Sequence, residues 1–370
     1  MQFLIKINAL KGRKKFLIHF YLLSKLFLIV LFILIILILI FIISKEKPKK
    51  VGVVGVRHEV NIGNNLIKYA ISIKLKELGY IPFIIGTQFL DFNISFINQT
   101  TNLRIIHNNF SEINKDDYDV LMVNSDQTWR KFDTNFYDYG FLKFAEKWKI
   151  KKLVYGASIG YDKWVFTPEE DIFMKNLIKD IKDISVREEG SIKLIEKHLN
   201  KTPIMVLDPT LLIDKHYYLD IIKNYQANIN FKKEFIFSYN VVYSKEVINA
   251  VESAKEYFDF EDYYFELNNT SSIQDFIYYL VKSSAIITNS YHGTIFSIIF
   301  NKPFITIYDK THAIERFNSL ANLFGIHDRM FEYEEKIDFY QLIKPLKINN
   351  KILNKLKLRS INFLKNCLKT

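Results

Sequence analysis

Short apolar runs of the kind that form buried strands alternate with stretches of helical periodicity along most of this 370-residue chain. In the first half, the strand-like runs lie at 51–56, 81–85, 104–106, 118–123, 153–155 and 184–186. In the second half, they lie at 204–207, 235–239, 263–267, 285–288 and 304–307. Because strands that are joined through helices lie parallel, the alternation predicts an α/β fold with a mostly parallel sheet in each half.

A sharp break in this alternation indicates where one domain ends and the next begins. Asp208-Pro209 ends the run at 204–207, and we place the junction between the halves at this strand. The sequence therefore predicts an N-terminal α/β domain over residues 51–203 and a C-terminal α/β domain over residues 204–331. Residues 332–370 show lysine-rich amphipathic patterns, which predict C-terminal helices that pack back across both domains.

An uninterrupted apolar run precedes the first domain. It extends over residues 26–43, roughly the 18 residues that a transmembrane helix needs, and no small-residue cleavage site follows it. We therefore predict a basic tail over residues 1–25, a transmembrane signal anchor over residues 26–44 and a linker over residues 45–50. The alternatives are a cleaved signal peptide and a buried core helix.

Basic residues flank the apolar run on both sides. The larger cluster precedes the run, which by the positive-inside rule favours a single-pass protein whose body lies on the non-cytosolic side. The lysines that follow the run nearly balance this cluster, so the sidedness stays open. They are Lys45, Lys47, Lys49 and Lys50.

The composition argues against several classes of protein. Hydrophobic residues make up 49% of the chain, too many for a disordered protein. The formal charge of +11 comes from dispersed lysines, and no nucleic-acid-binding motif is present, so we predict no nucleic-acid partner. Cys367 is the only cysteine and no two histidines fall at ligand spacing, so we predict no disulfide and no metal site.

Several polar segments follow predicted strands, and one of them lies at residues 289–294. Ligands of open α/β sheets bind where the strands end. The segment contains Ser290, His292, Gly293 and Thr294 and precedes a helical pattern at 295–300. Glycine allows a ligand to approach the turn closely, and the helix start directs free N–H groups at an anion. His292 is a candidate acid or base, although a histidine in such a turn is as often structural.

A second polar segment follows the strand at 51–56. It includes Asn61, Gly63 and Asn64 and leads into a helical pattern at 66–78. A strand, a glycine-containing loop and a helix start together receive phosphates or carboxylates. The glycine spacing is not the dinucleotide fingerprint, and no Walker lysine follows. An α/β unit that binds no nucleotide is the alternative.

Further candidates lie at the ends of other strands and after the last one. Arg187 either clamps a carboxylate or phosphate, or neutralises Glu188. Arg316 lies on a helical pattern that follows the strand at 304–307, and it either faces a ligand or lies on the surface. The same two alternatives hold for His312. A cluster of polar residues follows the strand at 118–123 and either binds a polar substrate or forms a capped turn. A serine after the strand at 153–155 is a further candidate. These residues are Ser125, Asp126, Gln127, Trp129 and Ser158.

The motifs, taken in order, resemble the polysaccharide pyruvyl transferase family from about Val51 to about Arg329. They are Asn61-Ile-Gly-Asn64, Asn124-Ser-Asp-Gln-Thr-Trp129, Tyr155-Gly-Ala-Ser158, Ser185-Val-Arg-Glu188, Asp208-Pro-Thr210 and Asn289-Ser-Tyr-His-Gly293-Thr294. The resemblance implies a glycosyltransferase-B-like body in which two Rossmann-like domains face a cleft. It also implies a transferase in glycan or cell-surface polysaccharide biosynthesis, with a glycan acceptor, phosphoenolpyruvate as donor substrate and no cofactor. Membrane association is predicted from the apolar run at 26–43 alone.

The resemblance implies roles for individual residues as well. His292 matches the family's active-site histidine and Arg187 its donor-anion arginine. Many members have an arginine two residues before that histidine, where this chain has Ser290, so the resemblance alone does not identify the donor. We assign Asp126 to the acceptor hydroxyls and the helix starts at Gly63 and Gly293 to supplementary N–H donors.

The implied chemistry moves pyruvate onto two sugar hydroxyls as a ketal. Protonation of the methylene carbon of phosphoenolpyruvate creates an oxocarbenium-like centre, which one hydroxyl attacks before phosphate leaves and the second closes the ring. This needs an acid or base with a near-neutral pKa and cations around the donor. Two alternatives remain: a nucleotide-sugar glycosyltransferase of similar fold, and a non-catalytic, membrane-anchored glycan-binding relative.

Overall fold

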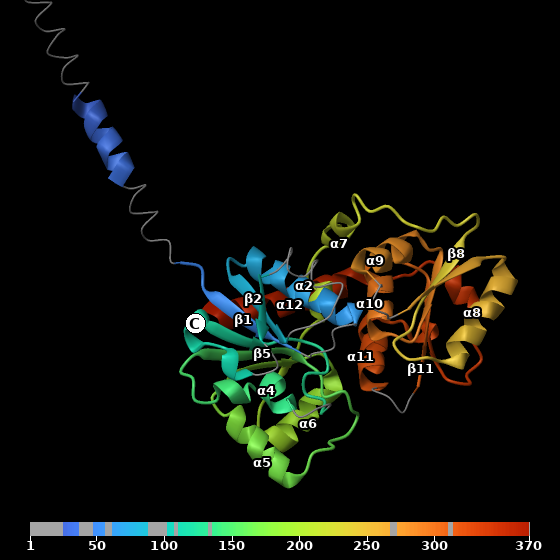
Figure 1. Cartoon of the computed structure of the whole chain (residues 1–370), viewed down its shortest axis with the longest axis horizontal. Helices are drawn as coiled ribbons and strands as arrows, with labels where there is room; N and C mark the ends of the chain where they lie inside the picture. Colours follow the sequence, from blue (N-terminus) through green and yellow to red (C-terminus); the bar gives the residue numbers. More distant parts are fainter. Residues whose placement is uncertain are drawn as a thin grey trace, which may run out of the picture. The chain divides into compact units, whose positions relative to one another are not determined.

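The structure of the protein is a computed structural model. It describes residues 25–36, 47–55, 61–87, 102–106, 110–131, 135–266, 272–309 and 314–369. The chain divides into an N-terminal unit, Met1–Pro48, and a compact body, Lys49–Thr370 (Figure 1). The body contains both predicted α/β domains.

The N-terminal unit holds a helix over residues 25–36, on which the apolar side chains from Leu26 to Ile36 are exposed. Within the described part of the chain, no helix has the length and apolar character needed to cross a membrane. The signal anchor predicted over residues 26–44 continues past residue 36, so its remainder lies outside the described residues. The anchor and the side of the membrane therefore stay predictions.

The first sheet contains seven strands among the described residues, in the order β3-β2-β1-β4-β5-β6-β7. Every neighbouring pair is parallel, as the alternation predicted. The strands are β1 (Lys50–Val54), β2 (Ile81–Thr87), β3 (Asn102–Ile106), β4 (Val120–Val123), β5 (Lys151–Ala157), β6 (Asp183–Val186) and β7 (Ile204–Met205).

Helices cover both faces of this sheet (Figure 1). Successive strand residues point to opposite faces, so Val53 packs in the core beneath one layer and Val54 in the core beneath the other. The first layer consists of α2 (Ile62–Glu77) and α12 (Asn350–Lys369). The second contains α4 (Phe136–Phe141), α5 (Pro168–Leu177) and α6 (Glu189–Leu199), with η1 (Phe110–Glu112) and η3 (Lys143–Ala145). The short η2 (Lys115–Asp117) follows η1 in the chain and has no buried residue.

The second sheet has the order β12-β11-β10-β8-β9 and is also parallel. Its strands are β8 (Phe235–Tyr239), β9 (Glu261–Phe265), β10 (Ala285–Thr288), β11 (Phe304–Tyr308) and β12 (Met330–Glu332). Helix α8 (Lys245–Phe258) packs on one face, and α9 (Ile273–Lys282), α10 (Tyr291–Ile299) and α11 (Ile314–Phe324) contribute to the core that contains α2. The connecting and terminal segments contain η4 (Pro209–Leu211), α7 (Lys215–Ile221), η5 (His327–Arg329) and η6 (Phe339–Leu342).

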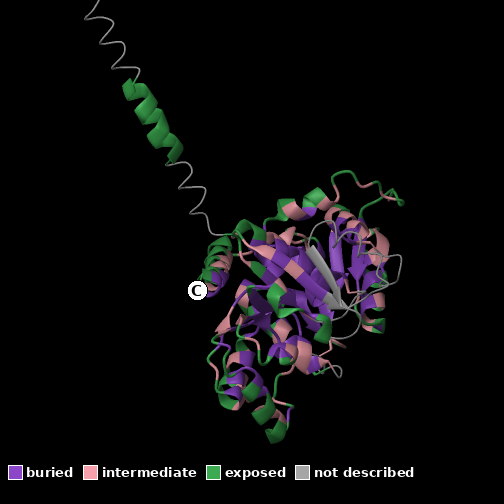
Figure 2. Cartoon of the chain, turned by 60° about the vertical axis from the view of Figure 1, so that its left-hand side comes forward, coloured by how far each residue is buried: buried purple, intermediate pink, exposed green. Residues whose placement is uncertain are grey.

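One core runs through both domains. It contains Val53 and Leu66 from the first domain, Ile295 and Leu320 from the second, and Leu364 from α12. Figure 2 shows the buried strands inside and exposed residues on the outer faces of the helices. Because these side chains pack in one cluster, the ends of strands from both sheets are held at a fixed separation.

The structure changes several details of the predicted organisation. Strand β7 pairs with β6, so the first sheet extends beyond residue 203 and the boundary falls after β7. Strand β12 was missed, because its three residues are too few for a periodic pattern. Helices α2 and α10 begin earlier than predicted, because Asn61 and Ser290 cap them by accepting from the N–H groups of Asn64 and Gly293.

Candidate active site

The first turns of α2 and α10 meet where the two domains join. A Cβ atom added to Gly63 would lie 2.2 Å from Nδ1 of His292, so the backbone of α2 lies directly against the imidazole. Only glycine fits at this approach. The contact brings together two predicted segments that are more than 200 residues apart in the chain, 61–64 and 289–294. Helix starts carry free N–H groups and a positive dipole, which favour an anion between them.

The start of α10 is tied closely to the end of β10. A Cβ atom on Gly293 would lie 2.3 Å from Oγ1 of Thr288, and Ser290 N–H donates to that oxygen at 3.0 Å. Thr294 is buried, and its hydroxyl contacts Oγ1 of Thr306 at 2.7 Å and the Ser290 carbonyl at 3.1 Å. Gly293 and Thr294 therefore fix the helix on the sheet, and this position sets the direction of His292.

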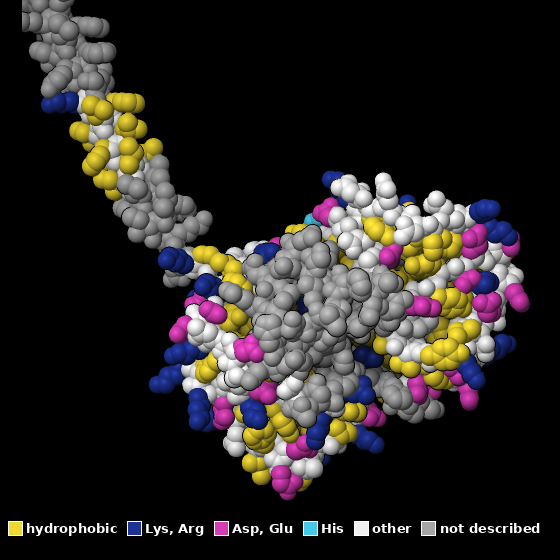
Figure 3. All heavy atoms as spheres, viewed as in Figure 1, with side chains coloured by type: hydrophobic (Ala, Val, Ile, Leu, Met, Phe, Trp, Pro, Cys, Tyr) yellow, Lys and Arg dark blue, Asp and Glu magenta, His cyan; other side chains and the backbone are white. Residues whose placement is uncertain are grey.

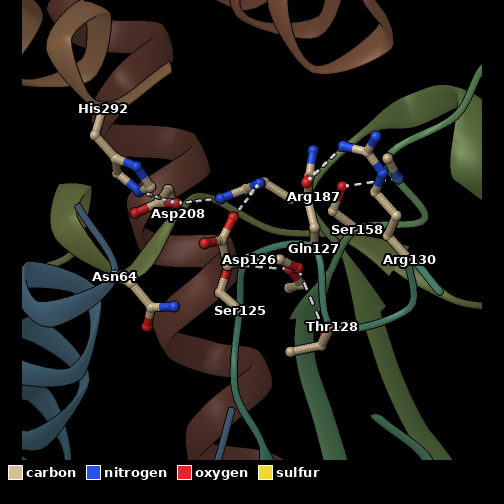
Figure 4. A network of polar contacts seen from close by, with 12 residues as sticks. Asn64, Ser125, Asp126, Gln127, Thr128, Arg130, Ser158, Arg187, Asp208 and His292 are labelled. Carbon is tan, nitrogen blue, oxygen red and sulfur yellow. Dashed lines mark hydrogen bonds and ion pairs between the residues drawn. The ribbon is translucent and has the colours of Figure 1, made fainter. Parts of the chain in front are cut away.

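Arg187 lies at the centre of a buried cluster of carboxylates (Figure 4). Its Nη1 donates to Asp208 at 2.8 Å, its Nη2 to Asp126 at 3.2 Å and its Nε to Glu188 at 3.2 Å. Only 1% of its side chain is exposed. Each guanidinium nitrogen thus donates to a carboxylate, and the bond to Glu188 is the one that the sequence offered as the alternative to a clamp on a bound anion.

Asp126 is the carboxylate of this cluster that is most open to a ligand. Its side chain is 12% exposed, against 2% for Glu188 and 0% for Asp208. Its φ is +88°, a strained value for a residue with a Cβ, and the N–H groups of Thr128 and Ser158 hold its carbonyl in place. Backbone strain of this kind persists where the surrounding structure enforces it, and it concentrates at functional sites.

The three carboxylates respond to their common arginine in different ways. Burial by itself would raise the pKa of Asp126, but Arg187, His292 and Arg316 hold that pKa below its usual value. Burial also opposes ionisation of Asp208, yet His292, Arg187 and Thr210 hold its pKa well below the usual range. For Glu188, burial outweighs Arg187 and the pKa is raised.

His292 lies between Gly63 and Asp208. Its Nε2 is 3.8 Å from Oδ2 of Asp208, too far for a hydrogen bond but near enough for a charge interaction if the ring is protonated. Asp208 itself is fixed, because Oδ1 accepts from N–H of Thr210 at 3.0 Å and from its hydroxyl at 2.6 Å. Nε2 of His292 is buried and has no hydrogen-bond partner among the described residues. A reacting group can therefore use this nitrogen.

Arg316 is a second guanidinium in the same place, and it forms no ion pair with any residue that the structure describes. Its Cζ lies 5.6 Å from the ring centroid of Tyr291, and Cζ of Arg187 lies 4.3 Å from that centroid. Nε of Arg316 is buried, and the described residues offer this side chain no hydrogen bond or ion pair. Burial and then the charge of Arg187 lower the pKa of Arg316 to about 10, so it stays charged at neutral pH.

The other predicted residues divide between this site and the core. Asn64 and Ser125 lie beside Asp126 in Figure 4, and the Gln127 amide nitrogen is buried without a partner among the described residues. Trp129 is buried and donates to the Gly140 carbonyl at 2.7 Å, which gives it a packing role. Ser158 Oγ accepts from N–H of Gly160 at 3.1 Å. His312 lies outside the described residues.

Three members of the site were not among the predicted site residues: Glu188, Asp208 and Tyr291. Asp208-Pro209 indicated only a strand end, and Glu188 only a neighbour for Arg187. All three belong to motifs that follow strand ends, and this position was the signal that could have identified them as site residues. The described residues contain no cluster of three or more His, Cys, Asp and Glu side chains suited to a metal.

The sequence model of one family, polysaccharide pyruvyl transferase, matches residues 61–311, which is more than half of the chain and spans every motif of the site. The chain belongs to the polysaccharide pyruvyl transferase family. This family supports a transferase that acts on glycans, and His292, Arg187 and Asp126 of this pyruvyl transferase family member all lie in the matched range. No curated protein matches the chain significantly.

Solved structures similar to this pyruvyl transferase family member share its two-domain α/β fold. The UDP-GlcNAc 2-epimerase of Methanocaldococcus jannaschii aligns with a TM-score of 0.54 at 14% identity, over 86% of this chain and 99% of the epimerase. The S. aureus MnaA structure with UDP aligns with a TM-score of 0.51 at 15% identity, over 86% and 91% of the two chains. At these identities, the similarity shows a glycosyltransferase-B-like fold and nothing about the ligand.

Proposed function

We propose that this protein transfers pyruvate from phosphoenolpyruvate to two hydroxyls of a glycan as a ketal, in glycan or cell-surface polysaccharide biosynthesis. The observation that carries the proposal is that His292, at the start of α10, and Arg316, on α11, each have a buried ring or guanidinium nitrogen without a hydrogen-bond partner among the described residues. A donor with a phosphate and a carboxylate needs cations and N–H groups beside a proton donor. This site combines these groups.

In this proposal, Arg316 and the starts of α2 and α10 bind the anionic groups of the donor. Arg187 is poorly placed to bind the donor, because each of its three nitrogens already donates to a carboxylate and only 1% of its side chain is exposed. Arg316 has no such partner among the described residues and stacks beside Tyr291, the residue that precedes His292. Arg316 therefore supplies the guanidinium that many family members carry at the position of Ser290. Arg187 instead positions Asp126 and Asp208.

His292 acts as the acid and base of the proposed reaction. Nε2–H gives its proton to the methylene carbon of phosphoenolpyruvate, which leaves an oxocarbenium-like centre at the next carbon. The first sugar hydroxyl forms a C–O bond there and returns its proton to Nε2. The C–O bond to phosphate then breaks, the second hydroxyl closes the ketal, and its proton leaves with phosphate. Asp126, the most exposed carboxylate, accepts hydrogen bonds from the sugar hydroxyls.

Membrane association belongs to the same proposal. The exposed apolar side chains of residues 26–36 support an N-terminal anchor, with the body on the non-cytosolic side. In that arrangement, the donor has to cross from the cytosol, where it is made. The glycan acceptor and its linkage are left to an acceptor screen.

Donor binding to the full chain in detergent tests the proposal. Calorimetry compares phosphoenolpyruvate with UDP-GlcNAc for the unaltered protein, for Arg316→Gln and for the control Arg359→Gln, which removes an exposed arginine from α12. We expect saturable phosphoenolpyruvate binding that Arg316→Gln weakens by about a hundredfold and Arg359→Gln leaves unchanged. Binding of UDP-GlcNAc alone would favour a nucleotide-sugar glycosyltransferase.

Turnover provides the second part of this test. We expect phosphate release from phosphoenolpyruvate to depend on an added glycan, and His292→Asn to slow it by about 10²–10⁴-fold. Glycan binding that persists in His292→Asn, with no turnover of any donor by the unaltered protein, would instead indicate a non-catalytic glycan-binding protein.

A further inference from the structure

Helix α12 presents a strongly basic face to solvent. Its exposed residues recur every three or four positions along the whole helix, so they form a single stripe. The stripe contains Lys351, Lys355, Leu358, Arg359, Asn362, Lys365 and Lys369, and all of them are exposed.

The sequence of α12 and of the segment just before it supplies no carboxylate to these cations. No Asp or Glu occurs after Asp338 in the chain. Two lysines near the stripe are paired, Lys344 with Asp328 at 3.0 Å and Lys357 with Asp214 at 2.8 Å. The five cations of the stripe have no ion pair with any described residue. By contrast, the face shown in Figure 3 intersperses basic and acidic side chains.

Apolar groups lie among these cations. Leu358 is 58% exposed within the stripe, and Ile352 beside it is 45% exposed. The first half of α12 also borders a cavity of about 570 Å³ whose walls include Leu211, Ile298 and Leu353. Lysines Lys215, Lys347 and Lys357 line the same cavity. A helix face that combines basic and apolar groups suits a binding surface with an anionic outer layer and an apolar layer beneath it.

The far end of α12 lies at the edge of the sheet where the chain enters the body. Cys367 interacts with Asp183, the first residue of β6, and Asp183 pairs with Lys151, the first residue of β5, at 3.3 Å. In parallel strands, these first residues lie at one edge of the sheet, and β1 begins there with Lys50. The segment that precedes β1 in the chain includes the exposed apolar helix at residues 25–36.

We propose that the basic face of α12 binds the surface of an anionic phospholipid bilayer. Phosphate and carboxylate headgroups neutralise the lysines, and Leu358 and Ile352 enter the boundary beneath them. A nucleic acid would match the charge, but it would leave these aliphatic side chains in water. The proposal does not depend on the donor or the reaction, because contact of the face with lipid can be measured without turnover.

Thiol labelling of the full chain in preformed vesicles tests this contact. Asn362→Cys places a thiol in the middle of the stripe, and Asn176→Cys places the control thiol on exposed α5. Buried Cys367, whose pKa burial raises to about 12, adds only a slow background that the unaltered chain measures. We expect a membrane-impermeant maleimide to label Asn362→Cys at least about fivefold more slowly in vesicles containing phosphatidylserine than in phosphatidylcholine vesicles.

Charge variants and salt identify the cause of any protection. About 0.5 M salt, or Lys351, Lys355 and Lys365 changed together to Gln, should restore fast labelling. Changing Lys179, Lys193 and Lys197 on the other side of the sheet to Gln is the matched control and should leave the protection intact. Equal labelling in both kinds of vesicle overturns the proposal. So does protection of Asn362→Cys by an oligonucleotide in solution that equals the protection by anionic vesicles.

Discussion

Positive charge is concentrated in two regions of this molecule, and they are built in opposite ways. Around Arg187, two guanidinium groups share a buried space with three carboxylates and a histidine. On α12, five cations stand in solvent with no carboxylate among the described residues near enough to pair with them. Arg187 in the first region is held by carboxylates of the same chain, whereas the cations of the second region are available to an anionic ligand.

The difference shows how the environment decides what an arginine or lysine does. A buried charge has to be paired, so Arg187 holds three strand ends in register and cannot leave them. An exposed cation costs little to keep, so the α12 face can exchange water and salt ions for a ligand. Arg316 is intermediate, since it lies inside the site but has no ion pair within the described part of the chain, and we therefore propose that it binds the donor.

The largest expected effect comes from breaking the buried cluster. Arg187→Met leaves Asp126, Asp208 and Glu188 buried without their cation, and we expect it to lower the free energy of unfolding by about 3–5 kcal/mol. Arg316→Met is the matched control, because it removes only a stacking contact worth about 1 kcal/mol or less. Urea denaturation measures both. Equal losses would mean that Arg316 has a structural partner after all.

The next effect separates the two arginines by function. We expect Arg316→Gln to lower kcat/KM for the donor by about 10²–10³-fold while the denaturation midpoint barely changes. Arg187→Lys keeps the charge but not the fork, so it should lose stability first and activity only as a consequence. If instead the Arg187→Lys protein folds normally and fails only to bind donor, Arg187 contacts the donor directly.

The pH dependence of stability distinguishes two carboxylates that share Arg187. The pKa of Asp208 is lower in the folded protein, so its charge stabilises the fold above the unfolded pKa of about 4 and this contribution is lost on acidification. We expect Asp208→Asn to cost roughly 2 kcal/mol at pH 7 and less at pH 3. Denaturation curves at both pH values measure the difference.

Glu188→Gln is the control for that experiment. The folded pKa of Glu188 is raised, so its contribution is present below the unfolded pKa and is lost as pH rises through the folded value. The substitution should therefore cost least at pH 7, the reverse of Asp208→Asn. The same trend in both variants would contradict the opposite pKa directions.

A smaller effect is expected where the two helix starts touch. A Cβ at Gly63 would overlap the His292 ring, so Gly63→Ala should displace the imidazole and reduce turnover by about tenfold. A Cβ at Gly55 would make only an ordinary contact, 3.7 Å from Cβ of Asn124, so Gly55→Ala should retain activity. Full activity in Gly63→Ala would show that the ring position is not critical.

Much of this fold could be predicted from the sequence, because apolar runs and helical periodicity report local structure directly. The starts of α2 and α10 could not, since glycines in their first turns looked like loop residues. Those glycines are required by a contact between the two helices, Gly63 against His292, and by the approach of Gly293 to Thr288. No local pattern encodes such contacts.

The sequence indicated which segments come together in the candidate site, but not how their side chains pair. His292, Arg187 and Asp126 were singled out because they follow strand ends, where parallel sheets bring side chains together. The carboxylate cluster around Arg187 could not be predicted, because its partners Asp126 and Asp208 are 61 and 21 residues away in the chain. Asp208 looked like a strand terminator beside a proline, and only the fold turns it toward the arginine and the histidine.

The smallest expected effect concerns the basic face of α12. Because Lys355 is exposed and has no ion pair with any described residue, Lys355→Gln should change the free energy of unfolding by less than about 0.5 kcal/mol. It should nevertheless weaken the protection of Asn362→Cys by anionic vesicles, since each lysine near the surface adds to headgroup attraction. A loss of stability without a change in labelling would mean that the lysine serves the fold. The α12 face would then resemble the Arg187 cluster, and the contrast between the two basic regions would fail.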